Sequence, residues 1–280
     1  MTLLQSVLFG IIQGLTEFLP VSSSGHLAIF QSLFGTDLGE GSLSFTVLLH
    51  LGTLIAVFIV YRKDIAELVR AFFSLCKKIV KGPRALSEMT VYERMVIYVF
   101  IATLPLIPAS LLEDKIAFIS AHVQAVGIIL LINAVMLYFS DRLASEKTPP
   151  EKVTAGNALI VGVMQIFAVL PGLSRSGSTI TAGLAQGFTR EYAVKFSFIL
   201  SIPAILGACA LDLPEFISET VSSGDTAQLM IYLTGALTAT AVGIAAIKLL
   251  IYISKKSNFR AFSYYSAAAG TAAIIAGILK

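Results

Sequence analysis

The stretch LPVSSSGH (residues 19–26) interrupts an apolar run that otherwise covers residues 2–34. Proline cannot donate a backbone hydrogen bond inside a helix, and serine is a good helix cap, so this stretch predicts a break between two half-helices. A second stretch, LPGLSRSGS (residues 170–178), interrupts the apolar run 155–187 in the same way. The sequence therefore predicts two hairpins, each made of a helix, a loop and a helix.

The rest of the chain has the composition of an integral membrane protein. Its 280 residues are 56% hydrophobic and 13% charged, whereas a soluble domain is about 25% charged. Six further apolar stretches are long enough to span a bilayer: about 42–60, 95–112, 123–140, 193–211, 229–251 and 261–279. The N-terminus lacks the basic region and cleavage site of a signal peptide, so we expect it to remain in the mature fold.

The distribution of charge predicts the topology. Four connections hold 17 of the 20 lysines and arginines: 62–94, 141–156, 188–195 and 248–260. Three others hold eight carboxylates and one lysine: 35–41, 113–122 and 212–228. The basic set should be cytoplasmic, and this alternation requires each hairpin to enter and leave on one side, the first from outside and the second from inside. The expected fold is all-α, with six transmembrane helices and two re-entrant hairpins; no nucleic-acid partner is expected.

The two hairpins also resemble each other. GIIQGLTEFLPVSSSGH (10–26) aligns without gaps with GVMQIFAVLPGLSRSGS (162–178), matching two glycines, one glutamine and two serines in order. Opposite entry sides and this match predict an inverted-topology repeat of residues 1–140 and 150–280 within one membrane domain. The functional site is then expected at the repeat interface, near the middle of the bilayer.

Four ionisable residues remain at membrane depth, and each is expected to serve a function because a charge inside a bilayer is costly. Glu17 and Arg175 are the opposite charges that should pair. Gln13 and Glu17 share a helix face and could bind a divalent cation, Mg²⁺ or Ca²⁺, or handle a proton. His26, beside the first tip, could act as acid, base or nucleophile. His50 is interpreted as interior packing or as a residue behind those that contact the substrate.

The hairpin tips are predicted to bind an anion of the phosphate type. Helix N-termini, serine hydroxyls and one guanidinium would converge there from two sides. For each serine, helix capping alone is the alternative. The expected substrate-binding residues are Ser22, Ser24, Gly25, Ser174, Ser176 and Gly177.

QGLTEFLPVSSSGH (13–26) followed by PGLSRSGST (171–179) resembles the undecaprenyl-diphosphate phosphatase family of the bacitracin-resistance type. The resemblance covers essentially the whole chain. It implies hydrolysis of a long-chain polyprenyl diphosphate to the monophosphate, which recycles the lipid carrier for cell-wall polymers and confers bacitracin resistance. It also implies a multi-pass plasma-membrane protein whose active site opens to the outer face.

The same resemblance assigns residue roles. It implies a divalent cation at Gln13 and Glu17, although Gln13 stands where the family often has glutamate, which predicts weaker metal binding. Attack on the terminal phosphorus by Ser23, by His26 or by water is left open. The implied catalytic residues are Glu17, Ser23, His26 and Arg175.

Two other functions compete with this one. A polyprenyl-phosphate transporter or flippase would also use broken helices near the bilayer centre, but it would need no nucleophile. Type 2 phosphatidic acid phosphatases also combine an S-G-H with an S-R element, but they need a second histidine where this chain has Thr181. The sequence leaves the prenyl chain length, the metal and the oligomeric state open, and a homodimer is compatible with it.

Overall fold

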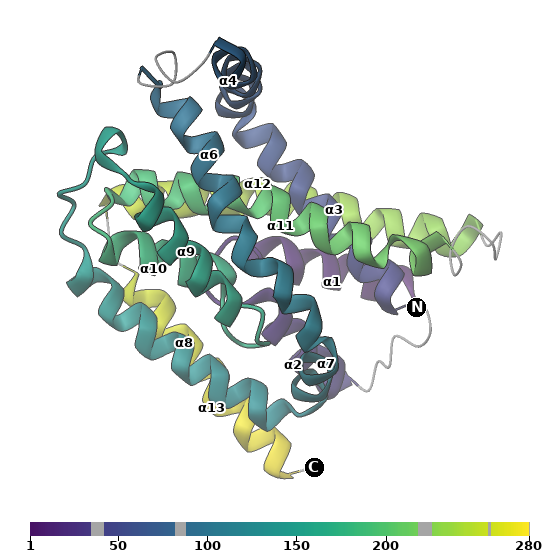
Figure 1. Cartoon of the computed structure of the whole chain (residues 1–280). Coiled ribbons are helices and arrows are strands. Elements are labelled where there is room, and N and C mark those ends of the chain that lie inside the picture. The colour runs from purple at the N-terminus through teal and green to yellow at the C-terminus, as the bar shows by residue number, and fades with distance from the viewer. Residues whose placement is uncertain (35–41, 82–87, 218–225, 257–258, 280) are drawn as a thin grey trace.

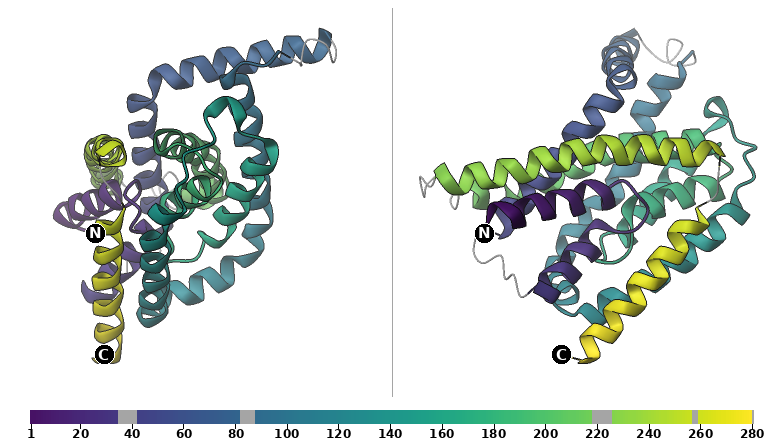
Figure 2. Two further views of the ribbon diagram at one scale, coloured as in Figure 1. Left: turned by 90° about the vertical axis from the view of Figure 1, so that its left-hand side faces the viewer. Right: turned by 180° about the vertical axis from the view of Figure 1, so that it is seen from behind.

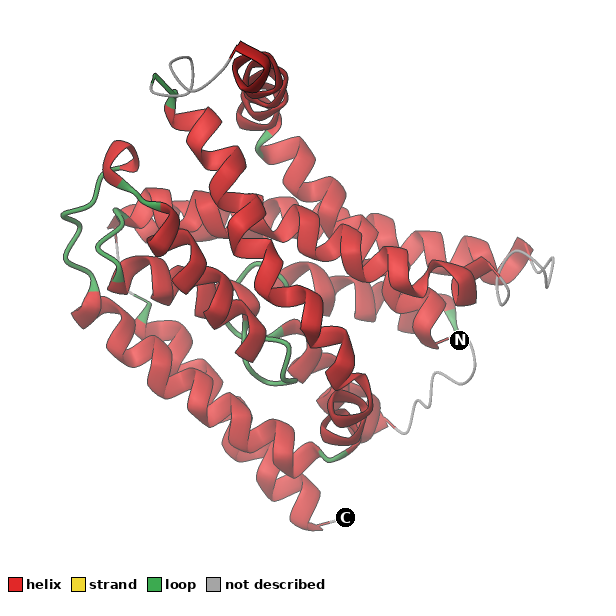
Figure 3. Ribbon diagram, in the orientation of Figure 1, coloured by secondary structure: helices red, strands yellow, loops and turns green. Residues whose placement is uncertain are grey.

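The computed structural model describes residues 1–34, 42–81, 88–217, 226–256 and 259–279 (Figure 1). Within these ranges the chain is helical and contains no strand, as the sequence predicts (Figure 3). The elements are α1 (Leu3–Thr16), α2 (Ser23–Phe34), α3 (Ser42–Val60), α4 (Arg62–Lys81), α6 (Val91–Thr103), the 3-10 helix η2 (Leu104–Leu112), α7 (Glu113–Ala121), α8 (Val123–Leu143), the 3-10 helix η3 (Pro150–Lys152), α9 (Ala155–Phe167), α10 (Arg175–Ala185), α11 (Arg190–Phe216), α12 (Thr226–Lys256) and α13 (Arg260–Leu279).

Among the described helices, five are long and apolar enough to cross a membrane. They are α6 continued into η2, α8, α11, α12 and α13. A sixth is reached when α3 and α4, which meet at an angle of 86°, are counted as one bent span. The helices α1 and α9 are apolar but shorter. The prediction of an all-α integral membrane protein is thus confirmed.

Helix α4 forms residues 62–81 of the connection that the sequence predicts to be cytoplasmic. The lysines and arginines that indicated a connection occupy one face of an amphipathic helix, and its other face is apolar. Asp64 joins this helix to two others: its Oδ1 accepts hydrogen bonds from Lys195 Nζ of α11 and from the Tyr92 hydroxyl of α6, both at 2.8 Å. The elbow between α3 and α4 is therefore held at a fixed position over α6 and α11.

The first hairpin breaks where its sequence predicts. Helix α1 begins with a capping box between Thr2 and Gln5 and ends at Thr16. Four residues beyond it lies Pro20, and Ser22 then adopts the left-handed region with φ 72°. That conformation is unusual for a residue with a side chain, and it reverses the chain before α2. The first tip is thus a tight turn whose backbone reverses at Ser22.

The second hairpin follows the same plan. Thr154 and Asn157 form the capping box of α9. Gly172, with φ 103°, makes the reversal that Ser22 makes in the first tip. Ser174 caps α10 by accepting a hydrogen bond from the Gly177 backbone N–H at 3.1 Å. Capping by this serine is therefore confirmed.

Each hairpin is seated among the long helices. Gly10 and Gly14 of α1 face α12 so closely that a Cβ at Gly14 would lie 2.7 Å from the carbonyl oxygen of Ala239. This is the close approach that a GxxxG pattern permits. The views in Figure 2 show α1 beside α12 and α8 beside α13. The loops that join α1 to α2 and α9 to α10 lie in the middle of the molecule (Figure 3).

Candidate active site

The tips of the two hairpins contact each other directly. The Ser22 hydroxyl accepts a hydrogen bond from the Gly172 backbone N–H at 3.2 Å, and the Ser176 hydroxyl donates to the Leu19 carbonyl at 3.3 Å. A Cβ at Gly25 would lie 2.9 Å from the Cα of Gly172. The backbones can meet this closely only because both positions are glycine.

Asn133 of α8 binds both tips at once. Its Nδ2 donates to the Pro20 carbonyl at 3.1 Å in the first tip, and its Oδ1 accepts from the Ser174 backbone N–H at 3.2 Å in the second. Nδ2 also lies 3.2 Å from the Ser266 hydroxyl of α13. Asn133 is fully buried. One amide thus fixes the relative position of the two loops.

A cavity of about 260 Å³ lies at the meeting point of the tips. Its polar wall carries side chains of both hairpins and of α3, and its apolar wall is built by η2, α11 and the second tip. Such a mixed lining suits a ligand with a charged head and an apolar remainder. The polar lining residues are Thr16, Glu17, Ser22, Ser23, Ser24, His50, Ser174 and Arg175.

Glu17 is the centre of the polar wall. Its side chain is 6% exposed and forms an ion pair with Arg175, so the predicted pairing of these charges is confirmed. Its other oxygen, Oε2, accepts hydrogen bonds from the Ser23 hydroxyl at 2.7 Å and from Gln13 Nε2 at 3.0 Å. His50 Nε2 lies 3.9 Å from the same oxygen. A buried carboxylate needs such partners because it has lost its water.

The three serines of the first tip have different surroundings. Ser22 is buried, and its hydroxyl already accepts hydrogen bonds from the backbone N–H groups of Gly25 and Gly172. Ser23 directs its hydroxyl to Glu17, whereas Ser24 is exposed. Of the three, only Ser23 has a carboxylate in position to accept its proton. The contacts thus place the Ser23 hydroxyl against the Glu17 carboxylate and the Ser22 hydroxyl against the backbone of both tips.

His26 is directed away from Glu17. Its Nδ1 lies 2.7 Å from the Ser22 carbonyl oxygen, and its Nε2 lies 2.8 Å from the Tyr265 hydroxyl of α13. The two rings are stacked, with centroids 5.5 Å apart. Both ring nitrogens thus have protein partners, and among the residues that line the cavity it is His50 that presents an imidazole. This arrangement suits a residue that positions the tip.

The remaining predicted ligands lie in the contact between the tips. The hydroxyls of Ser174 and Ser176 are 3.1 Å apart, and Ser174 also lines the cavity. Gly25 and Gly177 are absent from the described lining of the cavity. A Cβ at Gly177 would lie 3.2 Å from the Cβ of Pro20. These glycines allow close packing at the positions where we expected substrate contacts.

Of the two residues predicted to hold a divalent cation, only Glu17 has its side-chain oxygens engaged with protein partners. Glu17 is paired with Arg175, and Gln13 Oε1 is a buried oxygen for which the structure provides no hydrogen-bond partner. Ca²⁺ takes six to eight oxygen ligands, whereas Mg²⁺ takes six, several of them water, and is usually bound through one or two carboxylates and substrate phosphates. In the described part of the chain, no three His, Cys, Asp or Glu side chains gather into a possible metal site. As arranged, the pair does not fit a divalent cation held by the protein alone.

Comparison with known proteins agrees with the residues of the two tips. The chain matches the family model described as "Bacitracin resistance protein BacA" over residues 6–272. The chain belongs to the BacA family. The resemblance inferred from the two sequence motifs is thereby confirmed, because the match includes both hairpins and the long helices.

Three relatives that match the chain over nearly their full length are each named undecaprenyl-diphosphatase. The chain is 36% identical over 282 residues to the undecaprenyl-diphosphatase of Methanosphaera stadtmanae, with 99% of each protein covered. It is 37% identical over 280 residues to that of Alkaliphilus metalliredigens, with 100% of each covered. It is 40% identical over 268 residues to that of Methanobrevibacter smithii, covering 95% of this chain and 94% of the relative.

Proposed function

We infer that this BacA-family protein is an undecaprenyl-diphosphate phosphatase. It removes the terminal phosphate of the diphosphate, releases inorganic phosphate and returns the lipid carrier for cell-wall polymer synthesis, which confers bacitracin resistance. The observation that carries this inference within the site is the Ser23 hydroxyl, 2.7 Å from Glu17 Oε2 in a cavity that Arg175 also lines. A transporter would need the Arg175 guanidinium to bind an anionic head group, but it would not need a serine hydroxyl hydrogen-bonded to a carboxylate.

We propose the following chemistry for the site. Arg175 binds the oxygens of the diphosphate, because a guanidinium matches their charge and geometry. Glu17 accepts the proton of the Ser23 hydroxyl, whose oxygen attacks the terminal phosphorus as the polyprenyl phosphate leaves. Water then hydrolyses the phosphoserine. His26 positions the first tip through the Ser22 carbonyl and does not touch the phosphorus.

Direct attack by water is the alternative to a phosphoserine. Both routes need Glu17 as base, but only the first leaves phosphate on the protein. Phosphate found on Ser23 after rapid quenching supports the covalent route, and a Ser23→Ala protein that keeps most of its activity contradicts it. Ser140→Ala is the control, because its hydroxyl bonds the Leu137 carbonyl within α8 and it does not line the cavity.

The divalent cation expected from the sequence remains a prediction. Because Glu17 is engaged with Arg175, we propose that the cation enters as part of the substrate, bound to the diphosphate oxygens. Titration of Mg²⁺ or Ca²⁺ into the substrate-free protein should then give no saturable binding below millimolar concentrations. Tight binding that Glu17→Ala abolishes would instead show that the protein itself holds the cation.

The finer topology is also a proposal. We propose six membrane spans with α1–α2 entering from outside and α9–α10 from the cytoplasm, as an inverted repeat of residues 1–140 and 150–280. Support comes from the basic connections at 62–94 and 248–260 and the acidic one at 212–228. From the family resemblance, we also propose that the cavity opens to the outer face of the plasma membrane. Labelling of single cysteines introduced at Glu146, in the connection 141–156, and at Asp225, in the connection 212–228, from outside intact cells tests the topology, and only the second should react.

One experiment tests the function. Purified protein in detergent is given undecaprenyl diphosphate, with and without EDTA, beside Glu17→Ala and Arg175→Ala. Release of phosphate that both substitutions lower by a hundredfold or more supports the enzyme and its site. A folded wild-type protein that binds the lipid but releases no phosphate would contradict the phosphatase function and favour a lipid transporter.

A further inference from the structure

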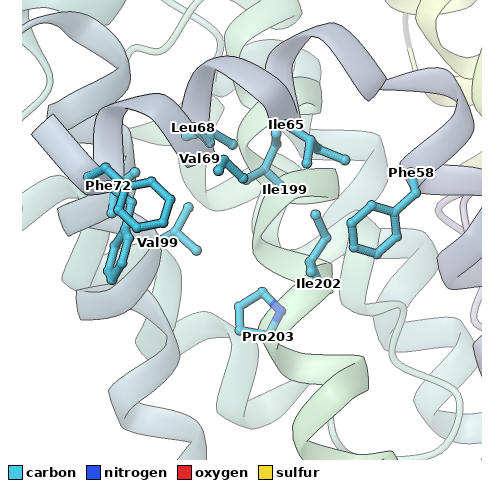
Figure 4. A pocket seen from close by; sticks show the side chains of 11 residues that line it. Phe58, Ile65, Leu68, Val69, Phe72, Val99, Ile199, Ile202 and Pro203 are labelled. Atoms are coloured by element: carbon cyan, nitrogen blue, oxygen red, sulfur yellow. The ribbon is translucent and has the colours of Figure 1, made fainter.

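Helix α4 has an apolar face that the protein covers only in part. Figure 4 shows Ile65, Leu68 and Phe72 of this helix beside a hollow of about 420 Å³, and the 11 residues that line the hollow are all apolar. Further along the same face, Phe73 is 60% and Val80 is 87% exposed. The apolar face of α4 thus extends beyond the part that contacts α6 and α11.

A row of lysines and arginines runs along α4 beside this apolar face. Lys63, Arg70 and Lys77 follow one another at intervals of seven residues, nearly two full turns, so they lie on one side of the helix. Phe73 follows Arg70 by three residues and Val80 follows Lys77 by three, which places each pair at neighbouring positions of the surface. What we call the basic row consists of Lys63, Arg70, Lys77 and Lys81, all of which are exposed.

The charge of α4 is not balanced within the protein. Its 20 residues include six lysines and arginines and two carboxylates, which leaves a net charge of +4. One carboxylate, Asp64, is bonded to neighbouring helices, and the other, Glu67, pairs with Arg70 at 2.6 Å. No carboxylate in the described part of the chain forms an ion pair with the three lysines of the basic row. These three charges are therefore available to anions outside the protein.

Contacts at both ends of α4 fix its orientation. At its start it meets α3 at an angle of 86°, so a membrane-spanning α3 places α4 nearly parallel to the bilayer surface. Toward its end, Lys78 Nζ pairs with Glu93 Oε2 of α6 at 2.8 Å, and the Ser74 hydroxyl donates to Glu93 Oε1 at 2.6 Å. Ala71 and Leu75 are buried. The helix therefore presents its exposed apolar face and its basic row in a fixed direction.

We propose that α4 lies in the cytoplasmic surface of the bilayer and that its basic row binds the phosphate groups of anionic phospholipids. The inference rests on the proposed topology, which makes the connection 62–94 cytoplasmic, and not on the chemistry of the catalytic site. A helix with aromatic and aliphatic side chains on one face and lysines on the next lies along a bilayer with its apolar face among the acyl chains. Its basic residues then lie at the level of the head groups, where anionic lipid attracts them. An acidic soluble protein is the competing partner.

The native Cys76 serves as a probe of the depth of α4. It is exposed and lies three residues after Phe73 and four before Val80, on the apolar face. In a Cys209→Ala protein in nanodiscs, a fluorophore on this cysteine should be quenched by nitroxide-bearing acyl chains more than by aqueous iodide. Moving the label to the basic row, with Cys76→Ser and Lys77→Cys, should lower the ratio of lipid quenching to iodide quenching by about fivefold. Equal ratios at the two positions overturn the proposal and favour the soluble partner.

The lipid preference is tested by removing the charges of the basic row. Native mass spectrometry of the purified protein gives the Kd for phosphatidylglycerol, which is anionic, and for phosphatidylcholine, which is zwitterionic. The wild type should bind phosphatidylglycerol about fivefold more tightly or better. The variant combines Lys63→Gln, Lys77→Gln and Lys81→Gln. The control removes three exposed lysines outside α4 by Lys115→Gln, Lys147→Gln and Lys152→Gln.

We expect the variant to lose the preference and the control to keep it. Unchanged binding of phosphatidylcholine shows that the variant is folded. No preference in the wild type, or equal loss in variant and control, overturns the proposal.

A third protein separates this surface from the catalytic cavity, because Arg175 could also attract a lipid phosphate. Arg175→Ala should keep the preference for phosphatidylglycerol. Loss of the preference in Arg175→Ala but not in the lysine variant would place the lipid in the cavity and overturn the proposal. Reaction of a cysteine at Glu146 from outside intact cells would instead reverse the topology and overturn the cytoplasmic placement of α4. The lipid measurements have no sidedness, so they fail only if α4 does not bind anionic lipid.

Discussion

Replacing Asn133 with leucine should separate the two hairpin tips from the helices that hold them. The substitution keeps the volume of the side chain nearly constant but removes its bonds to the Pro20 carbonyl and the Ser174 N–H. Each buried backbone group left without a partner costs about 1–3 kcal/mol, so the two together should lower the free energy of unfolding by about 2–6 kcal/mol. Asn133 is fully buried, so bulk water cannot replace these bonds without disturbing the packing.

The activity should fall as well, because Glu17 and Arg175 lie on the tips that Asn133 aligns. We expect a loss of at least tenfold in kcat, which corresponds to about 1.4 kcal/mol in the activation barrier. The assays are heat unfolding of the purified protein in detergent and phosphate release below the unfolding temperature. Ser263→Ala is the matched control, since its hydroxyl bonds the Ala134 carbonyl across the same α8–α13 pair without touching a tip. An Asn133→Leu protein as stable and as active as the wild type would refute this reasoning.

Three further substitutions test other contacts. Arg175→Lys keeps the charge but loses the planar fork, so kcat/KM for the diphosphate should fall about ten- to hundredfold, and a value equal to wild type would show that charge alone suffices. Gly25→Ala forces a methyl group against Gly172 and should lower the free energy of unfolding by about 1–3 kcal/mol, measured by heat unfolding. Unchanged stability would show that the two tips can move apart without cost. Tyr265→Phe removes one hydrogen-bond partner of His26 and should lower the free energy of unfolding by about 1 kcal/mol. Its activity should fall less than that of His26→Ala. A larger fall in Tyr265→Phe would show that the Tyr265 hydroxyl takes part in the reaction.

Much of the site was predictable because its features are local. Proline and serine in an apolar run predict a helix break, and the breaks lie at the predicted places. The pairing of Glu17 with Arg175 follows from the cost of isolated charges at membrane depth. Capping of α10 by Ser174 follows from the serine preference at helix starts.

Other features depend on how the helices are rotated and placed, which no local pattern encodes. Asn133 is a single polar residue in an apolar helix, and only the folded chain reveals the carbonyl and the N–H that it joins. The sequence neighbours of His26 and His50 do not give the rotation of α2 and α3, which directs the first histidine to Tyr265 and the second to Glu17. The lysines and arginines of residues 62–81 predict a connection, but their number alone does not show that they lie on one face of a helix.

The two charges of the site lie 158 residues apart in the chain. At a synthesis rate of about 5–20 residues per second, Arg175 leaves the ribosome roughly 8–32 s after Glu17. Throughout that interval the first hairpin has its serines and its carboxylate but lacks the guanidinium. Their ion pair is thus a late product of biosynthesis, and a nascent chain stopped before residue 175 would contain the Glu17 carboxylate and the Ser23 hydroxyl without the guanidinium that pairs with Glu17.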